Sequence, residues 1–407
     1  MRSTTTTTTT IIWGKSVYLN EMADIIPFKI NVASSEVELL SAKLKLTRLP
    51  DHGFAWTEEN SLTTSHVSEV VRFWQTKYSW RDEEARINAA LPQFITRVPV
   101  SDGFGPLDIH FVHKRSTAKK NVKKNIPLLF VHGWPGSFLE IEKGLEPLTS
   151  AGFDVVAPSL PGYGFSEYTT KKGFDLRKHA ETLHNLMCKL GYQNYVVQGG
   201  DWGSWVVRTI ALMYPQHVRA LHLNMFKTYK PAFPDGKEPE YTEYERHSLD
   251  RFHNWFLKTN IDYGSIQGAR PQTLGYSMHD SPVGLLVWIW DKLRLWSDNY
   301  PWTPTELITW TLMHYWPGPT TGFVMYMENN PPALMIQGSW GDKYLEMPCG
   351  FSAFPNELGI LPRSWAEKVA NVKFWKEHPT GGHFAMHERP EELVADLVSF
   401  FRGVWVD

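Results

Sequence analysis

The strongest constraint on the fold is an alternation of apolar strand, turn and helix patterns that begins near residue 107. Residues 126–131 (IPLLFV) form a continuous apolar run that stops at turn residues, which is typical of a parallel strand buried on both faces. Further strand patterns recur at residues 107–113, 153–157, 195–198 and 220–224. Helix patterns lie between them at residues 175–190, with Asp175 as the expected cap, and at 205–214. This alternation predicts an α/β sheet covered by helices.

A long insertion interrupts the alternation between about residues 227 and 330. This stretch has helical patterns and holds seven of the 18 tryptophans of the chain. Strand patterns resume at residues 333–337 and 372–375, before a last helix at 390–401. One sheet domain with an insertion therefore fits better than two consecutive domains. The aromatic side chains of the insertion favour a pocket for an apolar ligand.

The N-terminal part mixes helix patterns with turns. Residues 34–48 are predicted to form a helix with a Ser cap at Ser34, acidic residues in the first turn and basic residues in the last. Residues 67–78 place four apolar side chains on one helical face: Val67, Val70, Val71 and Trp74. We divide the chain into a flexible tail (1–24), an N-terminal segment (25–95), a first part of the core (96–227), a helical cap (228–331) and a second part of the core (332–407).

Composition excludes several classes of protein. The chain has 407 residues, of which 42% are hydrophobic and 21% charged, and a net charge of −2, so a disordered chain and a basic nucleic-acid-binding face are excluded. Its two cysteines, Cys188 and Cys349, cannot form a disulfide framework. No run approaches the ~20 apolar residues that a membrane span needs. The N-terminus does not have the pattern of a signal peptide. We therefore expect a soluble, cytoplasmic protein without a membrane anchor.

The motif GGDWG at residues 199–203 is the strongest local signal of chemistry. It has the form G-x-nucleophile-x-G between a strand and a helix, with Asp201 where hydrolases usually carry Ser. The alternative is an ordinary turn in which Asp201 caps the following helix. A carboxylate nucleophile attacks sp³ carbon and forms an alkyl ester, which water then splits at the carbonyl. Peptide and ester substrates would call for Ser or Cys instead.

A histidine base is expected after the last strand, where the motif GGH ends at His383. The order nucleophile, acid, His along the chain is typical of this architecture. His387 is the nearest alternative, whereas His132 and His222 lie beside strand ends and are expected to be structural. The acid that orients His383 must lie between the resumed strand and His383. Asp342 and Glu357 are the two candidates, and spacing alone does not choose between them, although the local pattern favours Asp342.

The loop HGWP at residues 132–135 follows the strand whose loop supplies half of an oxyanion hole in such folds. The backbone N–H groups of Trp134 and Trp202 are expected to face the Asp201 carboxylate. The alternative is a rigid loop in which Trp134 only packs. Phenol groups of the insertion are candidate proton donors to the oxygen that leaves when a carboxylate attacks carbon. No spacing rule selects among them: Tyr229, Tyr241, Tyr244, Tyr263, Tyr276, Tyr300, Tyr315 and Tyr326.

With these residues in place, the chain resembles the microsomal-type epoxide hydrolase family over nearly its whole length after about residue 25. The motifs that carry the resemblance are PFKI (27–30), TRLPD (47–51), HGWPGS (132–137), GGDWGS (199–204), GFSAFPNEL (350–358) and GGHFA (381–385). The resemblance implies an α/β-hydrolase fold with an N-terminal meander segment and a helical cap. It implies that Glu357 is the charge-relay acid, with Asp342 as the alternative. It also implies that Tyr263 and Tyr326 donate protons to the epoxide oxygen as the epoxide ring opens. The residues flanking Tyr326 depart from the family pattern.

The implied activity converts small apolar epoxides to vicinal diols with water, through an ester on Asp201 and with His383 as the base. No cofactor and no metal is expected, because protein groups fill every role. Two other functions stay open: a haloalkane dehalogenase, which shares the Asp nucleophile, and a catalytically inactive carrier of apolar ligands. A homodimer is also left open by the sequence.

Overall fold

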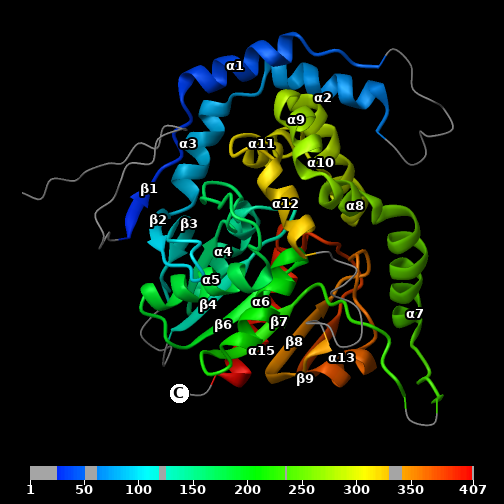
Figure 1. Cartoon of the computed structure of the whole chain (residues 1–407). Coiled ribbons are helices and arrows are strands. Elements are labelled where there is room, and N and C mark those ends of the chain that lie inside the picture. The colour runs from blue at the N-terminus through cyan, green and yellow to red at the C-terminus, as the bar shows by residue number, and fades with distance from the viewer. Residues whose placement is uncertain (1–24, 51–61, 119–124, 234–235, 330–341, 406–407) are drawn as a thin grey trace, which may run out of the picture.

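A nine-stranded sheet forms the centre of the computed structural model, which describes residues 25–50, 62–118, 125–233, 236–329 and 342–405 (Figure 1). The strands lie in the order β1-β2-β3-β5-β4-β6-β7-β8-β9. Their bounds are β1 Ile26–Phe28, β2 Gln93–Val98, β3 Leu107–Lys114, β4 Ile126–Val131, β5 Phe153–Pro158, β6 Tyr195–Gly199, β7 Val218–Leu223, β8 Leu345–Ala353 and β9 Ala370–Glu377. Strands β1, β2, β3 and β5 pair antiparallel, and the remaining pairs are parallel.

The centre of the sheet is buried on both faces. Every residue of β4, β5 and β6 is buried, as expected of parallel strands covered by helices. Helix α5 packs against α6, and α4 packs against α15. The helices that pack around the sheet are α4 Glu142–Ser150, α5 Leu176–Lys189, α6 Asp201–Met213, α13 Arg363–Val369, α14 Ala385–Glu388 and α15 Pro390–Val404, with a short 3₁₀ turn η2 at Phe138–Ile141.

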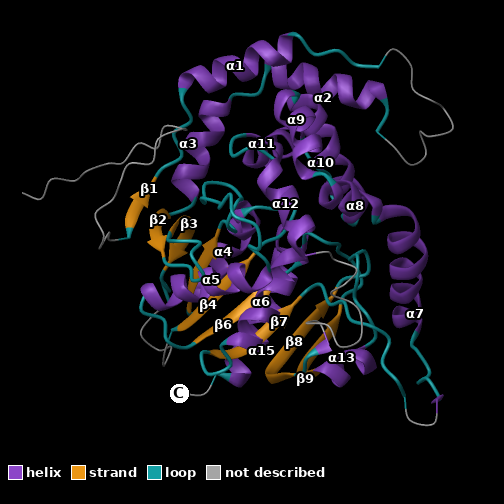
Figure 2. Cartoon of the chain, viewed as in Figure 1, coloured by secondary structure: helices purple, strands orange, loops and turns teal. Residues whose placement is uncertain are grey.

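The long connection between β7 and β8 is helical; in Figure 2 its helices α8 to α12 lie above the sheet, whereas α7 lies beside it. It contains α7 Glu243–Asp250, η4 Arg251–Asn260, α8 Asp262–Ala269, α9 Pro271–Asp280, α10 Pro282–Trp296, α11 Pro304–Tyr315 and α12 Thr320–Asn329. Helix α12 packs against α8 and α9, and α10 packs against α11. We call these helices the cap. Because β4, β6 and β7 run parallel, the loops at their carboxyl ends meet beneath it.

The N-terminal helices pack on the cap. They are α1 Ser34–Lys45, α2 Thr64–Thr76 and α3 Trp80–Ala90. Helix α1 contacts α10, and α2 contacts α11. Beyond α2, the hydroxyl of Tyr78 lies 3.0 Å from that of Thr309. Strand β1 meanwhile pairs with β2 at the edge of the sheet, so the N-terminal segment touches both parts of the protein.

Most elements expected from the sequence are confirmed. Strand β4 has the predicted bounds, and the Asp175 side chain caps α5 by accepting a hydrogen bond from the Arg177 N–H. The expected apolar face of α2 is buried: Val67, Val70, Val71 and Trp74. One expectation is wrong, because Ala33 and not Ser34 occupies the cap position of α1. The helix expected from residue 205 begins at Asp201.

Some predictions fall outside the described residues, namely the tail at residues 1–24 and the strand at 333–337. The proposed domain boundaries stay a prediction. In the parts of the chain that the structure describes, no helix has both the length and the apolar character needed to cross a membrane.

Candidate active site

Asp201 lies at a sharp turn between β6 and α6. Its backbone has φ of 45°, a left-handed conformation that is unusual for a residue other than glycine. The turn brings the backbone of Gly203 against β4, where a Cβ atom on residue 203 would lie 2.0 Å from the Val131 carbonyl oxygen. Glycine is therefore required here, and the tight turn lifts the Asp201 side chain out of the helix into a cavity.

The Asp201 carboxylate accepts hydrogen bonds from two backbone amides. The Trp134 N–H lies 2.8 Å from Oδ1, and the Trp202 N–H is the second donor. The other oxygen, Oδ2, lies 3.4 Å from Nε2 of His383. Burial raises the pKa of Asp201, but His383 and the two amides outweigh burial, so the pKa lies below its usual range. The carboxylate is thus ionised in the resting site and does not cap α6.

His383 lies between two carboxylates. Its Nδ1 is 2.6 Å from Oε1 of Glu357, and the side chains of His383 and Glu357 are 2% and 0% exposed. Burial would lower the pKa of His383, but Glu357 and Asp201 outweigh it and raise this pKa to about 10. The structure brings Glu357 to His383, whereas Asp342 hydrogen-bonds to Tyr229.

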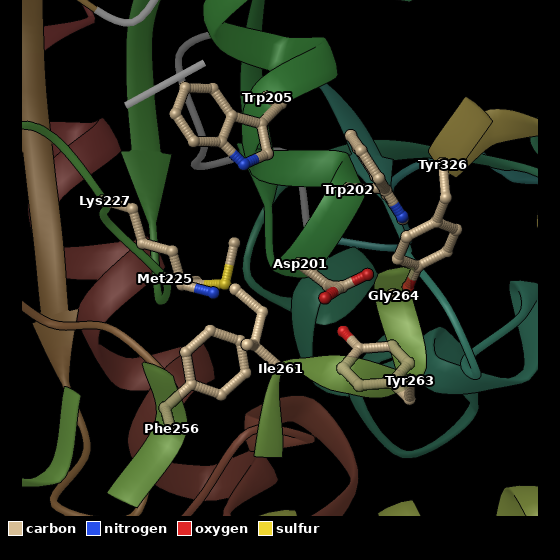
Figure 3. A pocket seen from close by; sticks show the side chains of 10 residues that line it. All are labelled: Asp201, Trp202, Trp205, Met225, Lys227, Phe256, Ile261, Tyr263, Gly264 and Tyr326. Atoms are coloured by element: carbon tan, nitrogen blue, oxygen red, sulfur yellow. The ribbon is translucent and has the colours of Figure 1, made fainter. Parts of the chain in front are cut away.

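Tyr263 of α8 and Tyr326 of α12 face Asp201 from the cap. Their hydroxyl groups point toward the Asp201 carboxylate, as Figure 3 shows. The two rings pack edge to face with centroids 5.7 Å apart. Burial and the charge of Asp201 raise the pKa of both phenols well above its usual value. Both hydroxyls therefore stay protonated at any working pH and can donate hydrogen bonds.

Two tryptophan rings hold these tyrosines in place. The Trp134 ring stacks on Tyr263 at 5.3 Å and meets Tyr326 edge to face at 6.0 Å. The Trp202 ring also meets Tyr326 edge to face, at 5.0 Å. Such aromatic pairs contribute roughly 0.5–1.5 kcal/mol each beyond area burial. Trp134 and Trp202 thus contribute both an amide to Asp201 and a surface to the cap.

A cavity of about 50 Å³ borders the Asp201 carboxylate. Its wall is apolar except around Asp201, the two tyrosines and one lysine. The lining residues are Asp201, Trp202, Trp205, Met225, Lys227, Phe256, Ile261, Tyr263, Gly264 and Tyr326. The sequence did not indicate Lys227 as a lining residue, because a single lysine in a loop has no distinctive pattern.

Glu140 is a second polar residue that the sequence analysis missed. Burial and the nearby Asp201 raise its pKa to about 8, although His383 and a hydrogen bond from the Gly133 backbone oppose this shift. The carboxyl group is therefore mostly protonated at neutral pH. It adds a neutral O–H donor close to the ionised Asp201 carboxylate.

Asp298 is a third residue without a sequence signal. Its carboxylate accepts a hydrogen bond of 2.7 Å from the Gly381 N–H and another from the Asn356 side chain. Asn356 precedes Glu357, and Gly381 lies two residues before His383. Asp298 follows the last residues of α10, so this cap residue connects the loops that carry Glu357 and His383.

The other histidines considered from the sequence lie elsewhere. His387 Nε2 is 3.2 Å from Glu306. His132 accepts a hydrogen bond from the Leu160 N–H, and His222 lies 3.0 Å from the hydroxyl of Ser352. His132 and His222 are buried and, as expected, hydrogen-bonded within the fold.

The fold and the site together define an α/β hydrolase that holds a carboxylate at the sharp turn between β6 and α6. The family model described as alpha/beta hydrolase fold matches residues 126–262, and the model described as Epoxide hydrolase N terminus matches residues 25–141. A putative epoxide hydrolase of Stigmatella aurantiaca is 33% identical over 93% of this chain and 85% of its own length. Epoxide hydrolase 1 of Sus scrofa is 31% identical over 93% of this chain and 89% of its own.

The solved structure of Aspergillus niger epoxide hydrolase is similar to this chain with a TM-score of 0.82. It is 30% identical and covers 94% of this chain and 97% of the other. The chain belongs to the epoxide hydrolase family, the enzymes that add water to an epoxide to give a vicinal diol. The resemblance found in the sequence motifs is thereby confirmed.

Proposed function

We propose that the protein hydrolyses epoxides in two steps through a covalent ester on Asp201. One observation carries this proposal: the ionised Asp201 carboxylate lies between the imidazole of His383 and the hydroxyls of Tyr263 and Tyr326. A nucleophile, a base and two proton donors therefore converge on one cavity. Its apolar lining supports substrates with an apolar body.

In the first step, Tyr263 and Tyr326 donate hydrogen bonds to the epoxide oxygen. Asp201 Oδ2 attacks a ring carbon from the opposite side, the C–O bond of the ring breaks, and one phenol transfers its proton to the oxygen. General acid help of this kind contributes roughly 10²–10⁴-fold to the rate. The product of this step is an alkyl ester of Asp201 that carries a neighbouring hydroxyl group.

In the second step, His383 removes a proton from water, which attacks the ester carbonyl. Glu357 orients the imidazole and stabilises its charged form. The amides of Trp134 and Trp202 stabilise the oxyanion, because Oδ1 already accepts a hydrogen bond from Trp134. Collapse of the tetrahedral intermediate breaks the bond between the Asp201 carbonyl carbon and Oδ2, and protonated His383 gives its proton to the leaving oxygen. The second proton of the water returns to the phenolate, so the diol leaves and both the Asp201 carboxylate and the phenol are restored.

Isotope labelling in a single turnover tests this proposal. Excess enzyme is mixed with styrene oxide in ¹⁸O-labelled water, and the diol is analysed by mass spectrometry. We expect the first diol to be unlabelled, because its new oxygen comes from Asp201, and we expect the label to enter the Asp201 peptide. Solvent label in the diol of the first turnover would exclude the ester mechanism in favour of direct attack by water.

A further inference from the structure

Lys227 is a buried cation whose ammonium group faces the cavity of Asp201. It follows β7 in the connection to the cap, and only 8% of the residue is exposed. In Figure 3 the side chain extends from the end of the cavity remote from Tyr326, and its nitrogen points inward. The proposed hydrolysis assigns no role to this residue.

The position of Lys227 is fixed by its surroundings. Its carbonyl oxygen accepts a hydrogen bond of 2.9 Å from Arg208, and its Nζ lies 4.1 Å from the centre of the Phe256 ring. Its methylene groups pass directly over Gly359, where a Cβ atom would lie 2.6 Å from Lys227 Cγ and Cε. A Cβ atom at position 359 would displace the Lys227 side chain, so Gly359 leaves room for its path to the cavity wall.

Lys227 has no anionic partner within the described ranges of the chain. By contrast, the ammonium group of Lys292, another buried lysine, pairs with the Asp291 carboxylate at 2.6 Å. Asp201 and Glu357 act on Lys227 only from beyond ion-pair distance, and both already bind His383. Burial lowers the pKa of Lys227 to about 8, so the group is still mainly charged at neutral pH. A buried charge without a partner is unfavourable, and a bound anion removes this cost.

We propose that Lys227 binds a carboxylate carried by the substrate, which makes epoxides with an apolar body and a carboxylate group the preferred class. The epoxide ring lies between Asp201 and the tyrosines, and the carboxylate lies at the other end of the cavity. Phe256, Met225 and Ile261 contact the apolar body between these two points. This inference rests on the proposed function of Asp201 and adds a specificity-determining residue to it.

Terminal epoxyalkanoates of increasing chain length, each compared with its methyl ester, test the inference. The methyl ester keeps the apolar body and removes only the charge. We expect kcat/KM of the wild-type protein to favour the carboxylate over its ester by about 10- to 100-fold at the chain length that fits. Lys227→Met should reduce this ratio to near unity, whereas Lys227→Arg should retain most of it. Lys373→Met, on an exposed position of β9, is the matched control and should leave the ratio unchanged.

Three outcomes would overturn the inference. The first is a wild-type protein that hydrolyses the esters but prefers no carboxylate of any chain length. The second is a Lys227→Met variant that slows carboxylate and ester alike, since the charge would then only support Asp201. The third is a ratio that falls equally in the Lys373→Met control.

The comparison within the wild-type protein needs no variant, so a folding defect of Lys227→Met leaves the inference testable. Failure of the proposed function has a different signature. In that case the first diol carries solvent ¹⁸O, whichever substrate is preferred.

Discussion

The carbonyl oxygen of Trp296 accepts a hydrogen bond of 2.9 Å from the backbone N–H of His383. Trp296 is the last residue of α10 in the cap, and His383 lies in the loop after β9. The Trp296 ring also meets the imidazole of His383 edge to face, with the centroids 5.1 Å apart. The cap therefore positions the proposed base as well as the two tyrosines.

Asp298 should act as a positioning residue for the acid and the base. Asp298→Ala removes the acceptor for Gly381 and Asn356, so the Glu357 and His383 loops lose a shared anchor. Because small misplacements of catalytic groups are costly, we expect kcat to fall about 10- to 100-fold with little change in KM. Steady-state kinetics measured across pH should also show a shift in the pKa of the pH–rate profile that reports His383.

Asp250→Ala provides the matched control, because Asp250 lies exposed at the end of α7 and accepts a hydrogen bond from the Asn254 side chain. Asp298→Asn should recover part of the activity, since an amide oxygen still accepts one hydrogen bond. A purely structural role for Asp298 would lower thermal stability without moving the pH profile.

Acidic pH should trap the alkyl ester. In the free enzyme the pKa of His383 is raised to about 10, partly by the charge of Asp201. Esterification removes that charge, so this pKa falls and the neutral imidazole becomes available as a base. Below the lowered pKa His383 is protonated and hydrolysis slows, whereas attack needs only ionised Asp201, whose pKa is depressed. Quenched reactions between about pH 5 and about pH 9 should show more alkyl-enzyme at the acidic end by intact mass.

Replacing the base should have the same effect at any pH. His383→Gln should accumulate alkyl-enzyme to nearly one equivalent, while His66→Gln, an exposed change in α2, should turn over normally. Rapid turnover by His383→Gln without an adduct would contradict the assigned base.

The two cap tyrosines should share the work of ring opening. Tyr263→Phe and Tyr326→Phe each remove one hydroxyl that points at Asp201, so we expect alkylation to slow about 10- to 100-fold in each variant. The double variant should lose nearly all activity. Stopped-flow tryptophan fluorescence can follow the alkylation step. Tyr276→Phe, at a position that is 73% exposed, is the control, and equal losses in all three single variants would argue against a specific role.

Gly133→Ala should inactivate the site without unfolding the protein. A Cβ atom at residue 133 would lie 2.3 Å from Asp201 Oδ1, so the nucleophile must move away from the Trp134 amide. We expect kcat/KM to fall at least about 100-fold, with circular dichroism unchanged. Gly403→Ala should keep full activity, because a Cβ atom at this position near the end of α15 would meet no atom of the described residues within 4 Å. Normal turnover by Gly133→Ala would show that the carboxylate does not need its present place.

The sequence predicts the parts of the fold that local patterns determine. Strand β4 was placed correctly because a continuous apolar run ends abruptly at turn residues. Strand β8 was missed because Pro348 and Gly350 weaken its pattern, and its place is set by pairing with β7 and β9. Strands β1 and β2 are not predicted because β1 has only three residues and its pairing with β2 joins residues far apart in the sequence.

Some residues of the candidate site can be predicted from the sequence, and others cannot. Asp201 and His383 stand in motifs whose small residues are needed for tight turns, so both could be found in the sequence. Glu357 could not be chosen over Asp342 by spacing, because only the folded loop brings its carboxylate to His383. Lys227 and Asp298 acquire their contacts from the cap, and no local pattern marks a polar residue whose partners are distant.

The placement of the cap within the chain has a consequence for biosynthesis. Asp201 is translated before the cap, the two tyrosines within it, and Glu357 and His383 after it. A chain that ends before the cap therefore holds Asp201 but neither the proposed base nor the proposed proton donors, and a chain that ends after the cap still lacks the proposed base. Under the proposed mechanism, turnover needs residues from both sides of the cap. A proteolytic cut that releases β8 and β9 should therefore abolish activity.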